Sequence, residues 1–99
     1  MARLTTKSTD GTSYYGINIT TSVSQLERVI GEAQYISNDG RNKTNFDWEC
    51  ETNEGDVFTI YDWKEYRPIS KDELIIFHIG AKSESVSKIA KNELEQLLS

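Results

Sequence analysis

Two alternating segments, joined by the short turn Asn53-Glu54-Gly55, constrain the fold of this 99-residue chain more than any other feature. Before the turn, apolar residues occupy every second position: Phe46, Trp48 and Cys50. After it, the segment Val57–Trp63 is rich in the β-branched and aromatic residues that favour strands. A three-residue loop that ends in glycine is typical of a β-hairpin. The sequence therefore predicts an antiparallel pair of strands with one apolar face.

This hairpin has a preferred register. The loop length places Cys50 opposite Phe58, which gathers the apolar side chains of both strands on one face of the sheet. A shift by one residue would bring acidic side chains onto that face. We therefore expect Glu49 and Glu51 to be exposed, and their burial would contradict the register.

The remaining pattern predicts two more strands and two helices. Period-two alternation indicates strands at Tyr15–Thr20 and at Leu74–Gly80. A serine hydroxyl can accept a hydrogen bond from a first-turn amide, so each helix is expected to begin after a serine. The candidate caps are Ser22 or Ser24 for the first helix and Ser83 or Ser85 for the second. The order β-α-β-β-β-α predicts one α+β domain, with a mainly antiparallel four-stranded sheet and both helices on one face.

Composition and charge limit the function. Residues 1–12 are polar and are expected to form a flexible leader, whereas residues 13–99 form the domain. The net charge of −5, from 11 basic and 16 acidic residues, argues against binding of duplex nucleic acid. We expect neither a signal peptide nor a membrane span, because a span needs about 20 apolar residues. One cysteine and one histidine leave no internal disulfide and exclude most zinc sites, so we expect no metal and no cofactor.

The polar face of the predicted sheet carries more large side chains than a face that meets only water requires. Tyr61, Trp63 and Ile76 all fall on it, which suggests either a contact surface, including one between copies of the chain, or simple strand propensity. Three residues of this face could supply an acid, a base and a polarising group: Glu49, Tyr61 and His78. Their spacing matches no catalytic motif, so His78 can equally be structural.

Basic residues gather at the end of the hairpin opposite its turn. Antiparallel pairing brings the start of one strand beside the end of the other, which places together Arg41, Lys43, Lys64, Tyr66 and Arg67. With Tyr61 and Trp63 nearby, this pole could bind a phosphate with a stackable base. Scattered surface Lys and Arg would give the same pattern.

The hairpin itself is acidic. Five carboxylates lie within ten residues: Asp47, Glu49, Glu51, Glu54 and Asp56. They could mimic nucleic acid toward a protein partner, or they could keep a solvated strand face soluble. Asp62 is different, because the alternation puts it on the apolar side. It requires a partner there, either Lys64, Arg67 or a backbone amide.

The segment Asn45–Trp63, together with Lys64 and the later Phe77-His78-Ile79-Gly80, resembles a family of small bacteriophage proteins. That family has a strand with Trp and Glu, a glycine turn, an Ile-Tyr-Asp-Trp-Lys-like strand, a His-Ile-Gly strand and a C-terminal helix. The matching residues here are Trp48, Glu49, Gly55, Ile60, Tyr61, Asp62, Trp63, Lys64, His78, Ile79 and Gly80. Phe77 stands where the family usually has tryptophan. The resemblance implies a viral setting in the cytoplasm of a bacterial host and no particular reaction.

These observations lead to competing hypotheses. The first is a non-enzymatic, phage-encoded counter-defence protein that sequesters a nucleotide-type signal or another small anionic ligand, with a homo-oligomer enclosing the ligand between subunits. The alternative is a protein–protein inhibitor of a host factor that uses the acidic hairpin. An enzyme built on Glu49, Tyr61 and His78 is a third possibility. A single-strand-binding replication accessory is a fourth, against which the negative charge argues.

Overall fold

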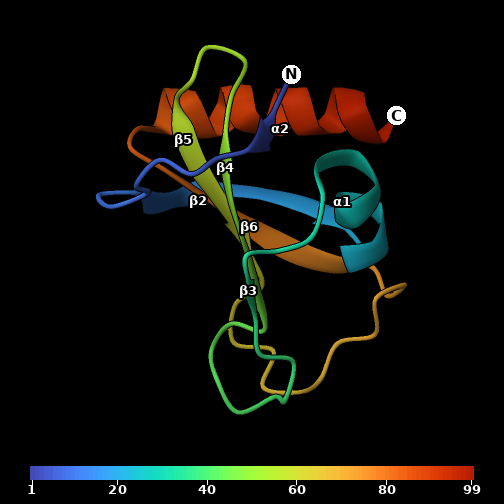
Figure 1. Cartoon of the computed structure of the whole chain (residues 1–99). Helices are drawn as coiled ribbons and strands as arrows, with labels where there is room; N and C mark the ends of the chain where they lie inside the picture. Colours follow the sequence, from blue (N-terminus) through green and yellow to red (C-terminus); the bar gives the residue numbers. More distant parts are fainter.

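A computed structural model describes residues 1–99 and contains one antiparallel sheet with two helices (Figure 1). The four longer strands are β2 (Ser13–Thr21), β4 (Phe46–Glu51), β5 (Val57–Tyr61) and β6 (Ile75–Ala81). Two strands of two residues each, β1 (Arg3–Leu4) and β3 (Tyr35–Ile36), complete the sheet. The strand order is β1-β4-β5-β6-β2, and β3 also pairs with β4. The helices are α1 (Val23–Ile30) and α2 (Glu84–Leu98).

The hairpin register predicted from the sequence is confirmed. Cys50 pairs with Phe58 and Trp48 with Ile60. The backbone amide of Thr52 donates to the carbonyl of Asp56 across 2.8 Å and closes the turn. The α+β class and the antiparallel sheet are also confirmed, but the four-strand count is wrong, because the sheet has six strands. β1 and β3 are too short to show any period in the sequence.

The expectation that both Glu49 and Glu51 would be exposed is wrong, and so is the inference that a buried Glu51 would contradict the register. Glu51 is only 8% exposed although the register is the predicted one. The N-terminal segment covers it: the Thr5 hydroxyl donates to Glu51 across 2.6 Å, and Arg3 lies 2.5 Å from the same carboxylate. Residues 1–12, expected to be a leader outside the domain, thus contribute β1 and the partners of a buried acid.

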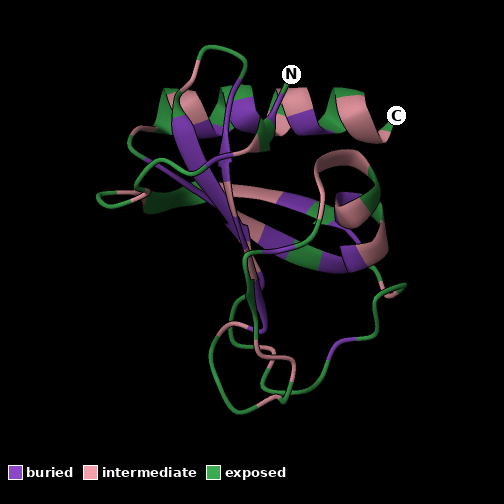
Figure 2. Cartoon of the chain, viewed as in Figure 1, coloured by how far each residue is buried: buried purple, intermediate pink, exposed green.

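Both helices contribute to a single core. Ser22 caps α1 and Ser83 caps α2, each by accepting a hydrogen bond from a first-turn amide at 3.2 Å. Their buried side chains join the apolar face of the sheet in one cluster, in which Trp48, Phe58 and Phe77 are fully buried. Figure 2 shows this burial concentrated in the middle of the strands and on the inner sides of the helices. The opposite face of the sheet is left without a helix, and the candidate site lies there.

Candidate ligand-binding face

A single cross-strand row runs over the uncovered face of the sheet. Tyr35 pairs with Asp47, Asp47 with Tyr61, Tyr61 with His78, and His78 with Asn18. Since directly paired residues project to the same side, these five side chains form one line across five strands. We call this line the central row.

The ring of Tyr14, which is not itself in the central row, packs against it. Tyr14 stacks on His78 with ring centroids 3.9 Å apart and planes within 8°. A bulge makes this possible, because the five residues Tyr14–Asn18 of β2 are set against the three residues His78–Gly80 of β6. The Tyr14 hydroxyl then donates to Asn18 across 2.7 Å. The resulting stack holds the His78 ring in one orientation.

Glycine at position 80 gives these rings their space. Gly80 pairs with Tyr14 on one side and Thr59 on the other, so its side chain would point onto the uncovered face. A Cβ at this position would lie 2.7 Å from Thr59 Oγ1 and 3.5 Å from the Tyr61 ring. Only glycine fits there without displacing a neighbour.

Trp63 forms the exposed end of this aromatic cluster. Its ring centroid lies 6.0 Å from that of Tyr61 and 6.3 Å from that of His78, and the residue is 40% exposed. The ammonium groups of Lys43 and Lys64 each lie 5.7 Å from the Trp63 ring centroid, within the range of a cation–π contact. Neither lysine forms a salt bridge. We call Trp63, Lys43 and Lys64 the Trp63 platform.

A buried carboxylate positions the two lysines. Asp62 is fully buried and accepts hydrogen bonds from the backbone amides of Asn45 and Phe46, at 2.9 and 2.8 Å, and from the Asn45 side chain at 3.0 Å. Of the partners considered from the sequence, the backbone amide is therefore the one found. The bonds fasten the start of β4 to the end of β5. Beyond them, the Lys64 amide donates to the Lys43 carbonyl across 2.7 Å, which holds the backbones of the two lysines together next to Trp63.

The backbone after β5 is unusual. Lys64 and Tyr66 have φ values of 56° and 50°, in the left-handed region that residues with a side chain seldom occupy. Such conformations cost roughly 1–2 kcal/mol each and persist only where the surroundings impose them. For Lys64, the hydrogen bond of its own amide to the Lys43 carbonyl and those of the neighbouring Asp62 carboxylate supply that constraint.

The other predicted members of the basic pole do not join the platform in the same way. Arg67 is engaged by carboxylates, with Glu65 at 3.3 Å and a two-bonded contact to Glu73. The hydrogen bond from Arg67 lowers the pKa of Glu73. Arg41 and Tyr66 are exposed, and neither side chain makes a hydrogen bond within the protein. Of the four predicted phosphate-binding residues, Lys43 and Lys64 are thus the two whose ammonium groups contact the Trp63 ring.

Asp47 is a member of the uncovered face whose importance the sequence did not reveal. Burial, together with the nearby carboxylates of Glu49 and Asp62, raises its pKa from 3.8 to about 6. Its Oδ1 atom is buried and has no hydrogen-bond partner. Burial also raises the pKa of Tyr61 and lowers that of His78. This end of the face therefore favours uncharged side chains, apart from the two lysines.

The three catalytic candidates are only partly brought together. Tyr61 and His78 are neighbours, with ring centroids 5.4 Å apart. Glu49 lies in the next row and accepts a hydrogen bond from the Thr9 hydroxyl at 2.9 Å. No group of three His, Cys, Asp or Glu side chains is arranged to hold a metal.

The acidic residues of the hairpin differ in their surroundings. Glu49 and Glu51 are held by the N-terminal segment, as described above, and Asp47 is half-buried. Glu54 and Asp56 are exposed and form no salt bridge. The exposed carboxylates of the hairpin that lack a salt bridge are therefore confined to its turn.

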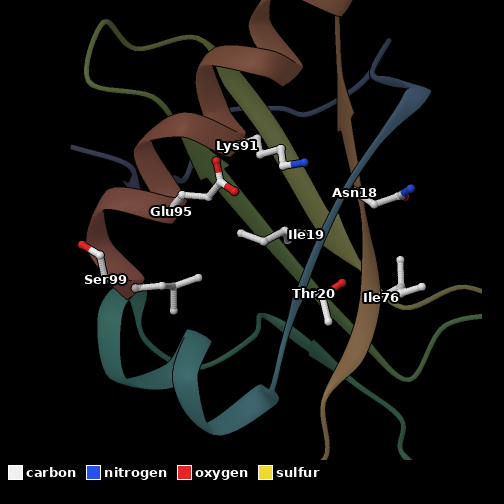
Figure 3. A pocket seen from close by; sticks show the side chains of 8 residues that line it. Asn18, Ile19, Thr20, Ile76, Lys91, Glu95 and Ser99 are labelled. Atoms are coloured by element: carbon white, nitrogen blue, oxygen red, sulfur yellow. The ribbon is translucent and has the colours of Figure 1, made fainter.

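Two hollows lie elsewhere on the surface. The larger, about 590 Å³, lies between β2 and the C-terminal half of α2 (Figure 3). The smaller, about 280 Å³, lies beside the hairpin turn and is lined by Lys7, Asp56 and Lys82 among others. Neither includes Trp63, so the Trp63 platform is an open surface and not a pocket.

Comparison with known proteins adds no relative: no family model, no curated protein and no solved structure matches this chain. None of its helices is both long and apolar enough to cross a membrane.

Proposed function

We propose that this chain is a non-enzymatic binding protein that captures a small ligand with an aromatic ring and an anionic group, such as a nucleotide-type signal. The observation that carries the proposal is the Trp63 platform. An exposed indole offers a stacking surface, and two lysines without carboxylate partners flank it. A nucleotide needs both contacts, because its base stacks and its phosphate pairs with ammonium groups.

The surroundings of the platform support a preformed site. The Trp63 ring packs edge-on against Tyr61, and the backbone that carries both lysines is fastened by Asp62. A site held in place before the ligand arrives loses less conformational entropy on binding. The resemblance to small bacteriophage proteins suggests the setting, in which capture of a host signal in the bacterial cytoplasm would counter a defence.

The alternative, an inhibitor that mimics nucleic acid with its acidic hairpin, has less support. Such a mimic needs several free carboxylates on one surface. Only the turn acids Glu54 and Asp56 are both exposed and free of salt bridges, because Thr5 and Thr9 engage the carboxylates of Glu51 and Glu49.

Binding of a defined panel tests the proposal: adenosine and guanosine mono-, di- and triphosphates and cyclic dinucleotides, by calorimetry. The protein should first be purified from bacteria and examined by native mass spectrometry for a retained ligand. We expect Trp63→Ala to weaken binding by about tenfold or more, the usual effect of losing one stacked base. Lys43→Ala and Lys64→Ala should weaken phosphate-bearing members of the panel more than the free nucleosides.

Two variants serve as matched controls. Tyr15 is 41% exposed, close to the value of Trp63, but its hydroxyl bonds the Lys82 carbonyl away from the platform. Tyr15→Ala and Lys82→Ala should therefore bind as the wild type does. No binding by any member of the panel, or equal losses in the Trp63 and Tyr15 variants, would overturn the proposal. Inhibition of a host protein that is lost on charge reversal at Glu54 and Asp56 would favour the alternative.

A further inference from the structure

The two edges of the sheet are treated differently. At the β4 edge, two short strands pair with β4 one after the other. β1 pairs with Cys50 and Glu51, and β3 pairs with Phe46 and Asp47. Little of the β4 edge is left open. At the other edge, β2, which is nine residues long, pairs with β6 on one side and with no strand on the other.

Apart from one bulge, β2 lacks the features that block a further strand. Natural proteins protect edge strands with charged residues, proline, bulges or covering segments. β2 reads SYYGINITT and contains neither charge nor proline, in a chain of which 27% is charged. The bulge between Tyr14 and Asn18 disrupts its first half. The regular segment Asn18–Thr21 remains available, and alternate residues of it point their amide and carbonyl groups away from β6.

The larger hollow lies along this same regular segment. Figure 3 shows Ile19 of β2 facing the gap toward α2, with Lys91 and Glu95 on the helix side. On the uncovered face of the sheet, Ile76 stands beside Thr20 and is 61% exposed. The open edge thus has a backbone ready to pair, an exposed apolar side chain beside it and a groove behind it.

We propose that a second copy of this chain pairs with the Asn18–Thr21 edge of β2 in antiparallel fashion, forming a symmetric dimer with one continuous sheet. A two-fold axis normal to the sheet generates this pairing and also makes the two α2 helices antiparallel. Continuity of the faces requires directly opposed residues to project to the same side. One residue of the segment therefore lies opposite its own copy at the two-fold axis, and Ile19 or Thr20 is that central residue.

The charges beside the edge suit two identical partners. A symmetric interface must be complementary to itself. Lys91 and Glu95 are one helical turn apart on α2, line the groove and form no salt bridge within the chain. The two-fold axis brings Lys91 of one copy toward Glu95 of the other, twice. An unrelated strand would find no such match, which is why a second copy is the preferred occupant.

This dimer is separate from the ligand proposal. β5, which leads to Trp63, is separated from the joined edge by β6 and β2. Both Trp63 platforms stay open on the same face of the extended sheet, so the dimer presents two sites side by side and does not enclose a ligand between subunits. Loss of the dimer leaves the platform intact, and loss of ligand binding leaves the dimer intact.

Sedimentation velocity of the full chain over a range of concentrations tests the inference. We expect a dimer for the wild type, and for Thr20→Lys a dissociation constant about tenfold or more higher, because lysine on an edge strand opposes pairing. Thr20 is exposed, so this change should leave the fold intact. The matched control is Ser70→Lys, at an exposed position in the connection between β5 and β6, which should dimerise as the wild type does.

A charge exchange gives a second, independent readout. Lys91→Glu alone and Glu95→Lys alone each place like charges against each other in a homodimer and should weaken it. Mixed together, the two variants restore complementarity, so native mass spectrometry should show the heterodimer in preference to either homodimer. A monomeric wild type at every concentration, unchanged dimerisation of Thr20→Lys, or a random mixture of the two charge variants would each overturn the inference.

Discussion

Removing the Asp62 carboxylate should be among the most damaging single changes in this chain. The side chain accepts hydrogen bonds from three donors, namely the amides of Asn45 and Phe46 and the side-chain nitrogen of Asn45. All of these groups are buried. Asp62→Ala leaves each donor without its partner, at a cost of about 1–3 kcal/mol apiece. Because water can enter the space that is left, we expect a total loss of about 3–5 kcal/mol.

This loss is large beside the whole stability of a domain of this size, which is about 5–15 kcal/mol. Urea denaturation followed by the fluorescence of the buried Trp48 measures it. The midpoint should fall by about 2 M or more at typical denaturant slopes. Asp62→Asn should lie between Ala and the wild type, because the amide keeps one acceptor.

Asp72→Ala is the matched control. Asp72 is exposed and accepts one hydrogen bond, from the Ser24 hydroxyl at 2.7 Å, so its removal should cost less than about 1 kcal/mol. If Asp62→Ala shifts the midpoint no more than Asp72→Ala does, the hydrogen bonds at Asp62 do not fasten β4 to β5, and the explanation for the position of the two lysines fails with them.

Three further perturbations test other parts of the structure. Folding raises the pKa of Asp47 from 3.8 to about 6, so the stability of the wild type falls as the pH rises between these values. Asp47→Asn should therefore add about 1 kcal/mol to the free energy of unfolding at neutral pH, after allowance for solvent screening. Urea titrations should show this gain disappearing toward pH 3.8. Gly80→Ala should lower the free energy of unfolding by about 1–3 kcal/mol, because the added Cβ would lie 2.7 Å from Thr59 Oγ1. The loss should be smaller in a Thr59→Ala background. Additive effects of the two substitutions in this double-mutant cycle would refute the steric explanation. Deletion of residues 1–6 should lower the melting temperature and promote aggregation through the uncovered β4 edge, whereas an unchanged melting curve would mean that β1 adds no stability.

The parts of the fold that could be predicted share a strong local signal. The β4–β5 hairpin combines alternation with a glycine turn, and its register followed from keeping acids off the apolar face. The two helix starts were narrowed to two serines each, and the first of each pair, Ser22 and Ser83, is the cap. Local patterns sufficed here because the spacing of apolar residues within each element shows both its type and the face that it buries.

The rest depends on contacts between distant residues. The burial of Glu51 could not be foreseen because its partners, Arg3 and Thr5, lie more than forty residues earlier in the chain. The engagement of Arg67 by Glu73 likewise depends on how one connection folds back. For Asp47, the sequence showed one acid among five, and only the packed sheet shows that its carboxyl is half-buried without a full set of partners.

The position of β1 has a consequence for the order in which the chain assembles. Arg3 and Leu4 leave the ribosome well before Glu51 and Cys50, the residues with which they pair. They must wait until β4 has been made, and β4 in turn pairs with β5 from Asp47 to Glu51. At about 5–20 residues per second, synthesis of the chain between β1 and β4 takes several seconds, and β1 has no partner strand during that time. β1 is thus synthesised before β4 but can pair only after it, and the unpaired backbone of β1 is open to other nascent chains during that interval.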